Sequence, residues 1–300
     1  MPGIGGADIH NAELAVIGGT GFYEMDGLSD LDEVELDTPF GAPSDRIMLG
    51  TLGDVRMAFL PRHGRGHRIL PSELPALANI WALKRLGVRR IISVSAVGSL
   101  REELAPQHVV VPDQLIDRTR GRPGSFFGRG LVAHVAFDRP FCPILSDLLA
   151  ASARSAGAAT HQGGTSVVID GPAFSTQAES RLYRSWNADI IGMTALPEAK
   201  LAREAEICYA NLSLVTDYDA WHESREPVSA EMIMTNLSEN VETAKRIVAE
   251  AAAALPPARD CACPTALASA LVTAPELVPE ATKRDLEPLI GRYMPVEAGV

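Results

Sequence analysis

Short apolar runs alternate with amphipathic stretches along most of the chain. The segment ELAVIGGTGF begins at Glu13 with apolar and β-branched residues and ends in glycines, which predicts a strand that leads into a tight turn. The two apolar runs of DRIMLGTLGDVRMAFLPRHG are separated at Gly53-Asp54 and predict a hairpin. RRIISVSAVGSL and HVVVPDQLID are too continuously apolar to alternate, which indicates strands buried on both faces.

Helical periodicity follows several of these runs. Residues 72–86 carry an apolar face, place Lys84 and Arg85 in the last turn and precede Gly87, which favours a helix that ends there. Further strands are predicted in TSVVIDGPAF, ADIIGM and EICYANLSLVTDYD, and further helices from an N-cap at Ser175, over residues 196–205 and over residues 230–255. This alternation of strands and helices predicts an α/β fold with a mixed, largely parallel sheet.

The chain divides into one long domain and two short ends. No segment between residues 13 and 255 has the composition of a linker, and Pro256-Pro257 interrupts the last long helical pattern. Prolines recur through the remaining residues. We therefore expect an N-terminal extension at 1–12, a single domain at 13–256 and a tail with short helices at 257–300.

Charge and composition narrow the classes of function. The 300 residues include 27 Lys and Arg against 38 Asp and Glu, a net charge of −11, and this acidic balance argues against a nucleic-acid binder. A small anionic substrate remains possible, because a local cluster of donors can bind phosphate inside an acidic protein. The N-terminus has no basic and apolar leader, and no apolar run reaches the ~18 residues of a membrane span. We expect a cytoplasmic protein that makes no membrane contact.

The four cysteines show no disulfide framework. Cys142 and Cys208 are far apart in the sequence, and Cys261 and Cys263 form a C-x-C pair near the end of the chain. A metal site would need more ligands near this pair, and the neighbouring sequence has none. We therefore expect two unrelated thiols in a loop, with a redox pair as the alternative.

Small, hydroxyl-bearing and basic residues stand at the carboxyl ends of four predicted strands. They belong to Gly18-Gly19-Thr20-Gly21, to the run RHGRGH from Arg62 to His67, to SAVGS from Ser95, and to Met193-Thr194. The glycine run matches neither the dinucleotide fingerprint nor the P-loop. Ligands of open α/β sheets bind at this edge, where backbone N–H groups, guanidinium and helix N-termini favour an anion. The set Thr20, Arg62, His63, Ser95 and Thr194 therefore predicts an oxyanion site.

Two carboxylates follow the last predicted strand. Asp217 and Asp219 flank Tyr218, and His222 and Glu223 are the nearest further candidates for metal ligands. Such a pair can cap a helix, bind a metal or accept hydrogen bonds from an exocyclic amine. The residues by themselves leave these three alternatives open.

Together these segments resemble the 5′-methylthioadenosine phosphorylases of the trimeric purine nucleoside phosphorylase family. The motifs that carry the resemblance, in the family's order, are IGGTGFY, DTPFGAPSD, RHGRGH, PSELPALANIWALKRLG, SAVGSLREEL, DQLIDRT, RPFCP, GPAFSTQAES, GMTALPEAKLAREAEICYA and TDYDAW. The match spans residues 13–255. It implies a single-domain nucleoside phosphorylase fold, in which helices flank a central mixed β-sheet, and assembly as a homotrimer.

The resemblance also implies a site, residue by residue. The implied phosphate-binding residues are Thr20, Arg62, His63, Ser95, Ala96 and Thr194. Asp217 and Asp219 are implied to be the catalytic acids that contact the purine. The other implied substrate-binding residues are Met193 under the ribose, Phe174, Ser175 and Thr216 near the base, Ala230, Ile233 and Met234 around the 5′ group, and His134 from a neighbouring subunit.

The implied reaction is phosphorolysis of S-methyl-5′-thioadenosine to adenine and 5-methylthioribose 1-phosphate, a pentosyl transfer in purine and methionine salvage. Phosphate is then a co-substrate, and neither a metal nor an organic cofactor is implied. An aspartate pair suits the 6-amino group of adenine, whereas relatives that act on 6-oxopurines carry asparagine at the first acidic position. Ala230 is smaller than the valine of relatives, so methylthioinosine, 6-oxopurine nucleosides and 5′-halogenated 5′-deoxyadenosine remain alternative substrates. A nucleoside- or phosphate-sensing binding protein is the non-enzyme alternative.

Overall fold

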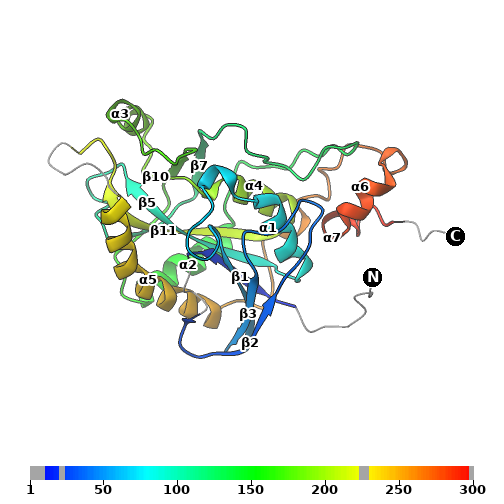
Figure 1. Ribbon diagram of the computed structural model, residues 1–300, viewed down its shortest axis with the longest axis horizontal. Helices are drawn as coiled ribbons and strands as arrows, with labels where there is room; N and C mark the ends of the chain where they lie inside the picture. Colours follow the sequence, from blue (N-terminus) through cyan, green and yellow to red (C-terminus); the bar gives the residue numbers. More distant parts are fainter. Residues whose placement is uncertain (1–10, 20–23, 223–229, 297–300) are drawn as a thin grey trace.

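The computed structural model describes residues 11–19, 24–222 and 230–296, and within them a single mixed sheet forms the centre of the molecule (Figure 1). Its eleven described strands are β1 (Leu14–Gly18), β2 (Leu28–Val34), β3 (Ile47–Leu52), β4 (Val55–Pro61), β5 (Arg90–Ser99), β6 (Val109–Val111), β7 (Gln114–Asp117), β8 (Thr160–Gln162), β9 (Thr165–Val168), β10 (Ile190–Gly192) and β11 (Cys208–Tyr218). The main path through the sheet runs β2-β3-β4-β1-β5-β10-β9-β7. The expected α/β class and mixed sheet are confirmed.

The long strand β5 organises the sheet. Its first half pairs in parallel with β1, its whole length pairs in parallel with β11, and its last residues pair antiparallel with β10. Strand β4 lies in parallel on the other side of β1. The carboxyl ends of β1, β4, β5 and β11 therefore point the same way, and the residues that follow them share one edge.

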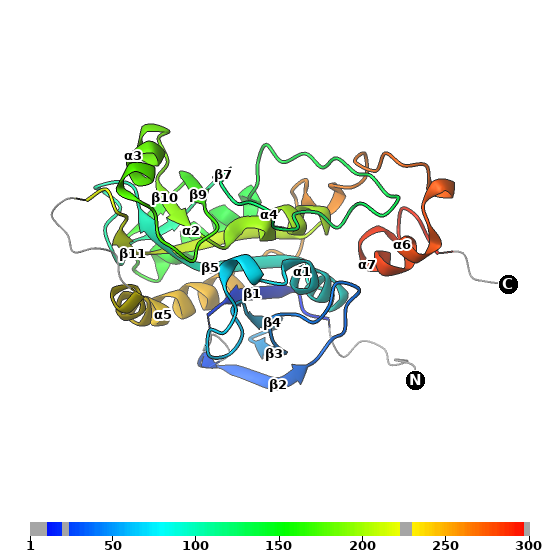
Figure 2. The same cartoon turned by 45° about the horizontal axis from the view of Figure 1, so that its top comes forward.

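Helices cover both faces of the sheet, as Figure 2 shows in a tilted view. The helices are α1 (Ala76–Arg85), α2 (Pro143–Ser155), α3 (Gln177–Ser185), α4 (Ala195–Glu204), α5 (Ala230–Ala253), α6 (Glu280–Asp285) and α7 (Glu287–Ile290), with short 3₁₀ turns η2 (Pro71–Glu73), η3 (Cys263–Thr265) and η4 (Pro275–Leu277). Side chains of β1 alternate between the two faces: Ala15 and Ile17 join the core under α1 and α4, whereas Leu14 and Val16 join the core under α2 and α5.

Two helix boundaries differ from those expected. The helix expected from residue 72 begins at Ala76, because Pro75 precedes it and the residues before that proline form the turn η2. The N-cap of α3 is Thr176 rather than Ser175: its hydroxyl accepts from the Glu179 N–H, and the Glu179 carboxylate accepts from the Thr176 N–H. The segments that form β2, α2 and β8 were not predicted as elements from the sequence.

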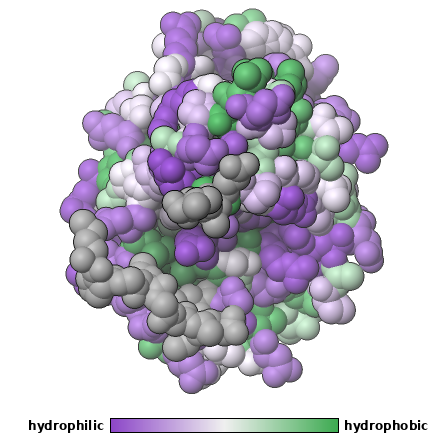
Figure 3. All heavy atoms as spheres, turned by 90° about the vertical axis from the view of Figure 1, so that its right-hand side faces the viewer, coloured by the Kyte–Doolittle hydropathy of each residue, from purple (hydrophilic) through white to green (hydrophobic). Residues whose placement is uncertain are grey.

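The segment after residue 256 packs against the same core as the rest of the chain. Leu267, Leu289 and Ile290 are buried together with α1 and α4, and the Trp81 indole N–H donates to the carbonyl of Asp285 at 2.9 Å. This end of the molecule has a mostly hydrophilic outer face with smaller apolar areas (Figure 3). Among the described residues, no helix is long and apolar enough to cross a membrane.

Candidate active site

Parallel pairing of β1, β4 and β5, with the antiparallel strand β10 beside β5, brings the predicted phosphate-binding segments together near the middle of β5. Gly18, at the end of β1, lies opposite Pro61 at the end of β4, and the Arg62 N–H donates to the Gly18 carbonyl at 2.9 Å. Ile17 lies opposite Ser93 of β5, so the carboxyl half of β5 extends beyond β1. The end of β4 and the middle of β5 therefore face the same space. Ser95 was expected at the end of its strand, but β5 continues to Ser99, so Ser95 lies within the strand.

Arg62 enters this space as one half of a buried ion pair. Its side chain is 3% exposed, and its Nε donates to Glu198 at 2.6 Å. Nη1 donates to the Val94 carbonyl, and Nη2 donates to the Ile17 carbonyl and the Ser93 hydroxyl. The second Nη1 hydrogen has no partner among the described residues. Although burial alone would lower the pKa of Arg62, the Glu198 carboxylate raises it above its ordinary value, so the guanidinium stays charged.

His63 is a neutral imidazole. Burial lowers its pKa to about 4, and the Arg62 charge acts in the same direction. Its Nδ1 lies 2.8 Å from the Ile69 carbonyl, which can only accept, so Nδ1 carries the proton and Nε2 presents a lone pair. The ring stacks on His67 with centroids 4.2 Å apart. At neutral pH this histidine accepts a hydrogen bond and adds no positive charge.

Two hydroxyl groups meet across the space between β5 and α4. The Ser95 Oγ lies 3.1 Å from the Thr194 Oγ1, and the side-chain amide of Asn211 donates to Ser95 at 3.2 Å. Thr194 is the N-cap residue of α4, and Ala96 follows Ser95 on β5. Together with Arg62 and His63, these predicted phosphate-binding residues come from the ends of β4 and β10 and from the middle of β5.

A β-bulge positions the two aspartates. The pairing of β11 with β5 shifts between Val215 and Asp217, which leaves Thr216 as the extra residue and places Asp217 opposite Gly98. A Cβ atom at Gly98 would lie 3.2 Å from the Asp217 Oδ2 and 3.4 Å from the Asp219 Cβ. Both aspartates therefore lie against the backbone of Gly98, and a larger residue at this position would press on their side chains.

Both carboxyl groups are buried, and burial raises the pKa of each. The pKa of Asp217 rises to about 6, because burial and the nearby Asp219 charge outweigh the hydrogen bond from the Thr216 hydroxyl at 2.8 Å. Burial likewise raises the pKa of Asp219, while the hydroxyls of Ser180 and Ser175 partly oppose it. Neither hydroxyl forms a hydrogen bond of ordinary length, so Asp219 Oδ2 and both Oγ atoms are buried without a partner among the described residues. Buried polar atoms of this kind mark a place where a ligand can complete the hydrogen bonding.

The remaining predicted site residues differ in their exposure and in the residues they contact. Phe174, just before Ser175, is 41% exposed, and Met193 packs on Gly171, where a Cβ would meet its sulfur. His134 is exposed on an extended segment whose backbone pairs with Ala270. Thr20 and the side chains of Ala230, Ile233 and Met234 lie outside the described residues, so their predicted roles stay predictions.

Two charged residues that were not predicted from the sequence hold this centre together. Glu198 is 2% exposed and accepts from Arg62, the Ser93 hydroxyl and the Tyr209 hydroxyl. The Arg122 guanidinium donates to the carbonyls of Met193 and Leu196 and so fixes the turn into α4. The one available signal is position: Glu198 stands in the first turn of a helix that follows a strand, where an acid is ordinarily a surface residue.

The expectation that Cys261 and Cys263 are two unrelated thiols in a loop is wrong. Cys142 and Cys208 join Cys261 and Cys263 in one cluster, in which the four sulfur atoms lie within 4.8 Å of one another. Cys208 begins β11 and Asp217 nearly ends it, a separation of about 30 Å at roughly 3.3 Å per residue. Because its members come from three distant segments, local spacing in the sequence does not reveal this cluster.

Known proteins share this fold and much of this sequence. The family model of the phosphorylase superfamily matches residues 13–253. The S-methyl-5′-thioadenosine phosphorylase of Chloroflexus aurantiacus is 57% identical over 95% of this chain and 99% of its own, and that of Gloeobacter violaceus is 56% identical over 94% and 96%. A methylthioadenosine phosphorylase crystal structure from an antarctic soil metagenomic library superposes with a TM-score of 0.90 at 49% identity, covering 93% of this chain and 99% of its own. The chain belongs to the phosphorylase superfamily and, within it, to the group of the S-methyl-5′-thioadenosine phosphorylases.

Proposed function

We propose that the protein cleaves S-methyl-5′-thioadenosine with phosphate to give adenine and 5-methylthioribose 1-phosphate. The relatives that match nearly all of the chain are named S-methyl-5′-thioadenosine phosphorylases, which supports this reaction. The observation that carries the chemistry is the buried pair Asp217 and Asp219, where the pKa of Asp217 is raised to about 6. A carboxyl group with a pKa near the working pH is suited to act as a general acid.

Phosphate is the nucleophile in this proposal. It binds between the ends of β4 and β10 and the middle of β5, where the hydroxyls of Ser95 and Thr194 meet and where one Nη1 hydrogen of Arg62 has no partner among the described residues. Because Glu198 balances the Arg62 charge, hydrogen bonds contribute more to the selection of phosphate than net positive charge does. The neutral His63 accepts a hydrogen bond from a protonated phosphate oxygen. Thr20 and Ala96 complete the proposed phosphate-binding set.

The purine leaves as the glycosidic bond breaks. A protonated Asp217 donates to purine N7, so that the base departs without full negative charge, and it accepts from the 6-amino group. General acid catalysis of this kind contributes roughly 10²- to 10⁴-fold to a rate. The negative phosphate stabilises the ribosyl cation that develops at the same time. The direct attack requires no covalent enzyme intermediate, and we propose that neither a metal nor an organic cofactor takes part in it.

The aspartate pair also favours adenine over 6-oxopurines. A carboxylate opposite a 6-oxo group would leave two acceptors facing each other, at a cost of about 1–3 kcal/mol, which corresponds to roughly 10- to 100-fold discrimination. The unpartnered Asp219 Oδ2, Ser175 Oγ and Ser180 Oγ provide further groups for the base edge. Phe174, Thr216 and Met193 line the base and ribose in this proposal.

The proposal also covers which 5′ substituent the protein binds and how its subunits assemble. Ala230, Ile233 and Met234, spaced i, i+3, i+4, would present an apolar surface to a methylthio group, and His134 of a neighbouring subunit would reach it. The exposure of His134 is compatible with a contact between subunits. We propose a cytoplasmic homotrimer, and native mass spectrometry of the purified chain tests the trimer directly.

The deciding experiment is adenine release measured with and without phosphate. We expect adenine to appear from S-methyl-5′-thioadenosine only when phosphate is present, and Asp217→Asn to lose this activity while a control in an exposed turn, Asp54→Asn, keeps it. Adenine release without phosphate would make the protein a hydrolase, and binding without release would favour a sensor. A kcat/KM series with adenosine, inosine, methylthioinosine and a 5′-halogenated analogue separates the alternative substrates, and equal turnover of inosine would contradict the role given to Asp217.

A further inference from the structure

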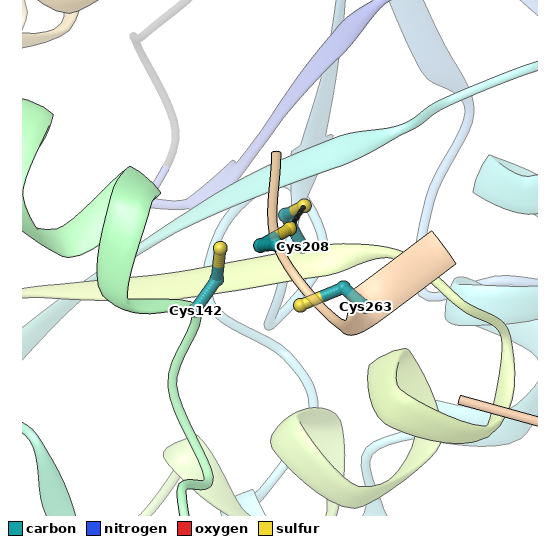
Figure 4. Close-up of side chains that lie close together, drawn as sticks. Cys142, Cys208 and Cys263 are labelled. Atoms are coloured by element: carbon teal, nitrogen blue, oxygen red, sulfur yellow. Dashed lines mark hydrogen bonds between the residues drawn. The ribbon is translucent and has the colours of Figure 1, made fainter. Parts of the chain in front are cut away.

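The four cysteines form a compact buried cluster at the amino end of β11. Cys142 is the N-cap residue of α2, and Cys208 begins β11. Cys263 begins η3, and Cys261 lies two residues before it. Figure 4 shows the side chains of Cys142, Cys208 and Cys263 directed toward a common centre from three separate segments. Cys142, Cys208 and Cys263 are buried and Cys261 is partly buried.

The spacing of the sulfur atoms fits a single tetrahedral ion. All four lie within 4.8 Å of one another, and the Cys208 and Cys261 sulfurs are 3.5 Å apart. A zinc ion with Zn–S bonds of about 2.3 Å holds its four sulfurs about 3.8 Å from one another. A disulfide would join two of them at about 2 Å and leave the others outside. The four thiols therefore form one cluster rather than two disulfide-bonded pairs.

The surroundings provide room and compensating charge. A cavity of about 10 Å³ adjoins the cluster and is lined by Cys142, Cys208 and Cys261, together with Arg90 and Arg259. This volume is of the size that holds one water molecule or a small ion. The Arg259 Nε is buried and has no partner among the described residues. Because the Arg90 charge is paired with Glu13, Arg259 is the guanidinium that would offset part of the excess negative charge of a divalent tetrathiolate site.

Arg90 also fixes the segment that carries the C-x-C pair. Its Nη2 donates to the carbonyls of Pro256 and Ala258 at 2.6 and 2.9 Å, and its Nη1 forms an ion pair with Glu13. These bonds hold the chain just before Cys261 against the amino end of β5. Such support around the ligating residues orients them and is a regular feature of metal sites in proteins.

We propose that Cys142, Cys208, Cys261 and Cys263 form a structural zinc site that fastens the C-terminal segment to the sheet. Soft thiolate ligands in tetrahedral geometry select zinc among the common divalent ions, and four protein ligands leave no open position for catalysis. Binding is a ligand exchange without electron transfer: each coordinating thiol loses its proton to solvent, and the sulfur lone pair forms the bond to Zn²⁺. The site is about 30 Å from Asp217 at roughly 3.3 Å per strand residue, so its contribution is to stability.

The test begins with the metal content of the native chain. The full-length protein, purified without a histidine tag and without chelators, should contain about one zinc per chain, released when a mercurial reagent blocks the thiols. Replacement of zinc by Co²⁺ should give the intense visible bands of tetrahedral cobalt thiolate. Intact mass after alkylation under denaturing conditions counts free thiols in the same sample, and all four should react once the metal is removed.

Variants locate the metal. Cys142→Ser and Cys263→Ser should each lower the zinc content several-fold and lower Tm, whereas kcat measured below the unfolding range should remain within about twofold of the parent. His161→Gln is the matched control, because His161 pairs with His108 at 3.0 Å in a second group of possible ligands away from the cysteines. Its zinc content should equal that of the parent.

Three results would overturn the proposal. Native protein that holds no zinc and takes up neither Zn²⁺ nor Co²⁺ when reduced would show that the cluster is not a metal site. Thiols that resist alkylation until a reductant is added would show disulfides instead. Iron in place of zinc would refute the choice of metal. None of these measurements depends on whether a serine variant folds, or on the proposed reaction.

Discussion

Replacement of Asp217 by asparagine should remove activity on S-methyl-5′-thioadenosine, retain or raise turnover of 6-oxopurine nucleosides and, at the same time, make the protein more stable. The carboxyl group is 5% exposed, lies near Asp219 and has its pKa raised from 3.8 to about 6. A raised carboxyl pKa means that folding disfavours the ionised form. Asparagine keeps an oxygen that can accept from the Thr216 hydroxyl but carries no charge. The variant therefore avoids the free-energy cost of a buried carboxylate.

The magnitude follows from the two pKa values. A shift of about 2 units corresponds to about 3 kcal/mol at 1.36 kcal/mol per unit. Below the unfolded pKa near 4 the group is protonated in both states and costs nothing. The cost grows as pH rises from about 4 to 6 and is then constant, because the unfolded state releases its proton first. The stability gain of Asp217→Asn should thus be about 3 kcal/mol at pH 8 and about half of that at pH 5.

Equilibrium urea unfolding at a fixed protein concentration, from pH 5 to pH 8, measures this difference. The result of interest is the free energy of unfolding of the variant minus that of the parent at each pH, with Asp54→Asn in an exposed turn as control. The difference should rise with pH for Asp217→Asn and stay flat for the control. A flat difference for both variants, or a loss of stability at pH 8, would refute the assignment of a buried, high-pKa carboxyl group to Asp217.

Three further predictions test the surrounding structure. Glu198→Gln leaves the Arg62 charge buried without its partner, so it should lower the free energy of unfolding by about 3–5 kcal/mol and raise KM for phosphate. The control Glu35→Gln, in an exposed ion pair, should change neither quantity. Equal effects of the two variants would show that burial of the Arg62–Glu198 pair is unimportant. Thr176→Ala removes the α3 capping box and should lower the free energy of unfolding in urea by about 1 kcal/mol. A loss below a few tenths of a kcal/mol would show that the capping box does not stabilise α3. Gly98→Ala places a methyl group against Asp217 and Asp219 and should lower kcat/KM for the nucleoside by tenfold or more. An unchanged kcat/KM would show that the backbone at the bulge shifts to accommodate the methyl group.

Local patterns suffice to predict much of the fold. The apolar runs of β1, β5 and β11 and the hairpin turn at Gly53-Asp54 are predictable from the residues alone, because strand burial and turn chemistry act over a few neighbouring positions. The pattern is weaker where burial is incomplete. The strand β2 is polar and mostly exposed, and no apolar alternation marks it. Residues 72–75 fit a helical pattern, although Pro75 delays the helix to Ala76.

The sequence by itself determined the α/β class, the position of Arg62, His63 and Thr194 just after strands, and the motifs that define the family, because each depends on residues close together along the chain. Ser95 was also expected at a strand end, but it lies within β5. Tertiary structure decided what lies beside them. It paired Arg62 with Glu198 across 136 residues, set the pKa of Asp217 through burial, and brought four cysteines from three segments within 4.8 Å. Such contacts depend on how distant segments pack, and neither solvation nor the proximity of remote side chains is encoded in local periodicity.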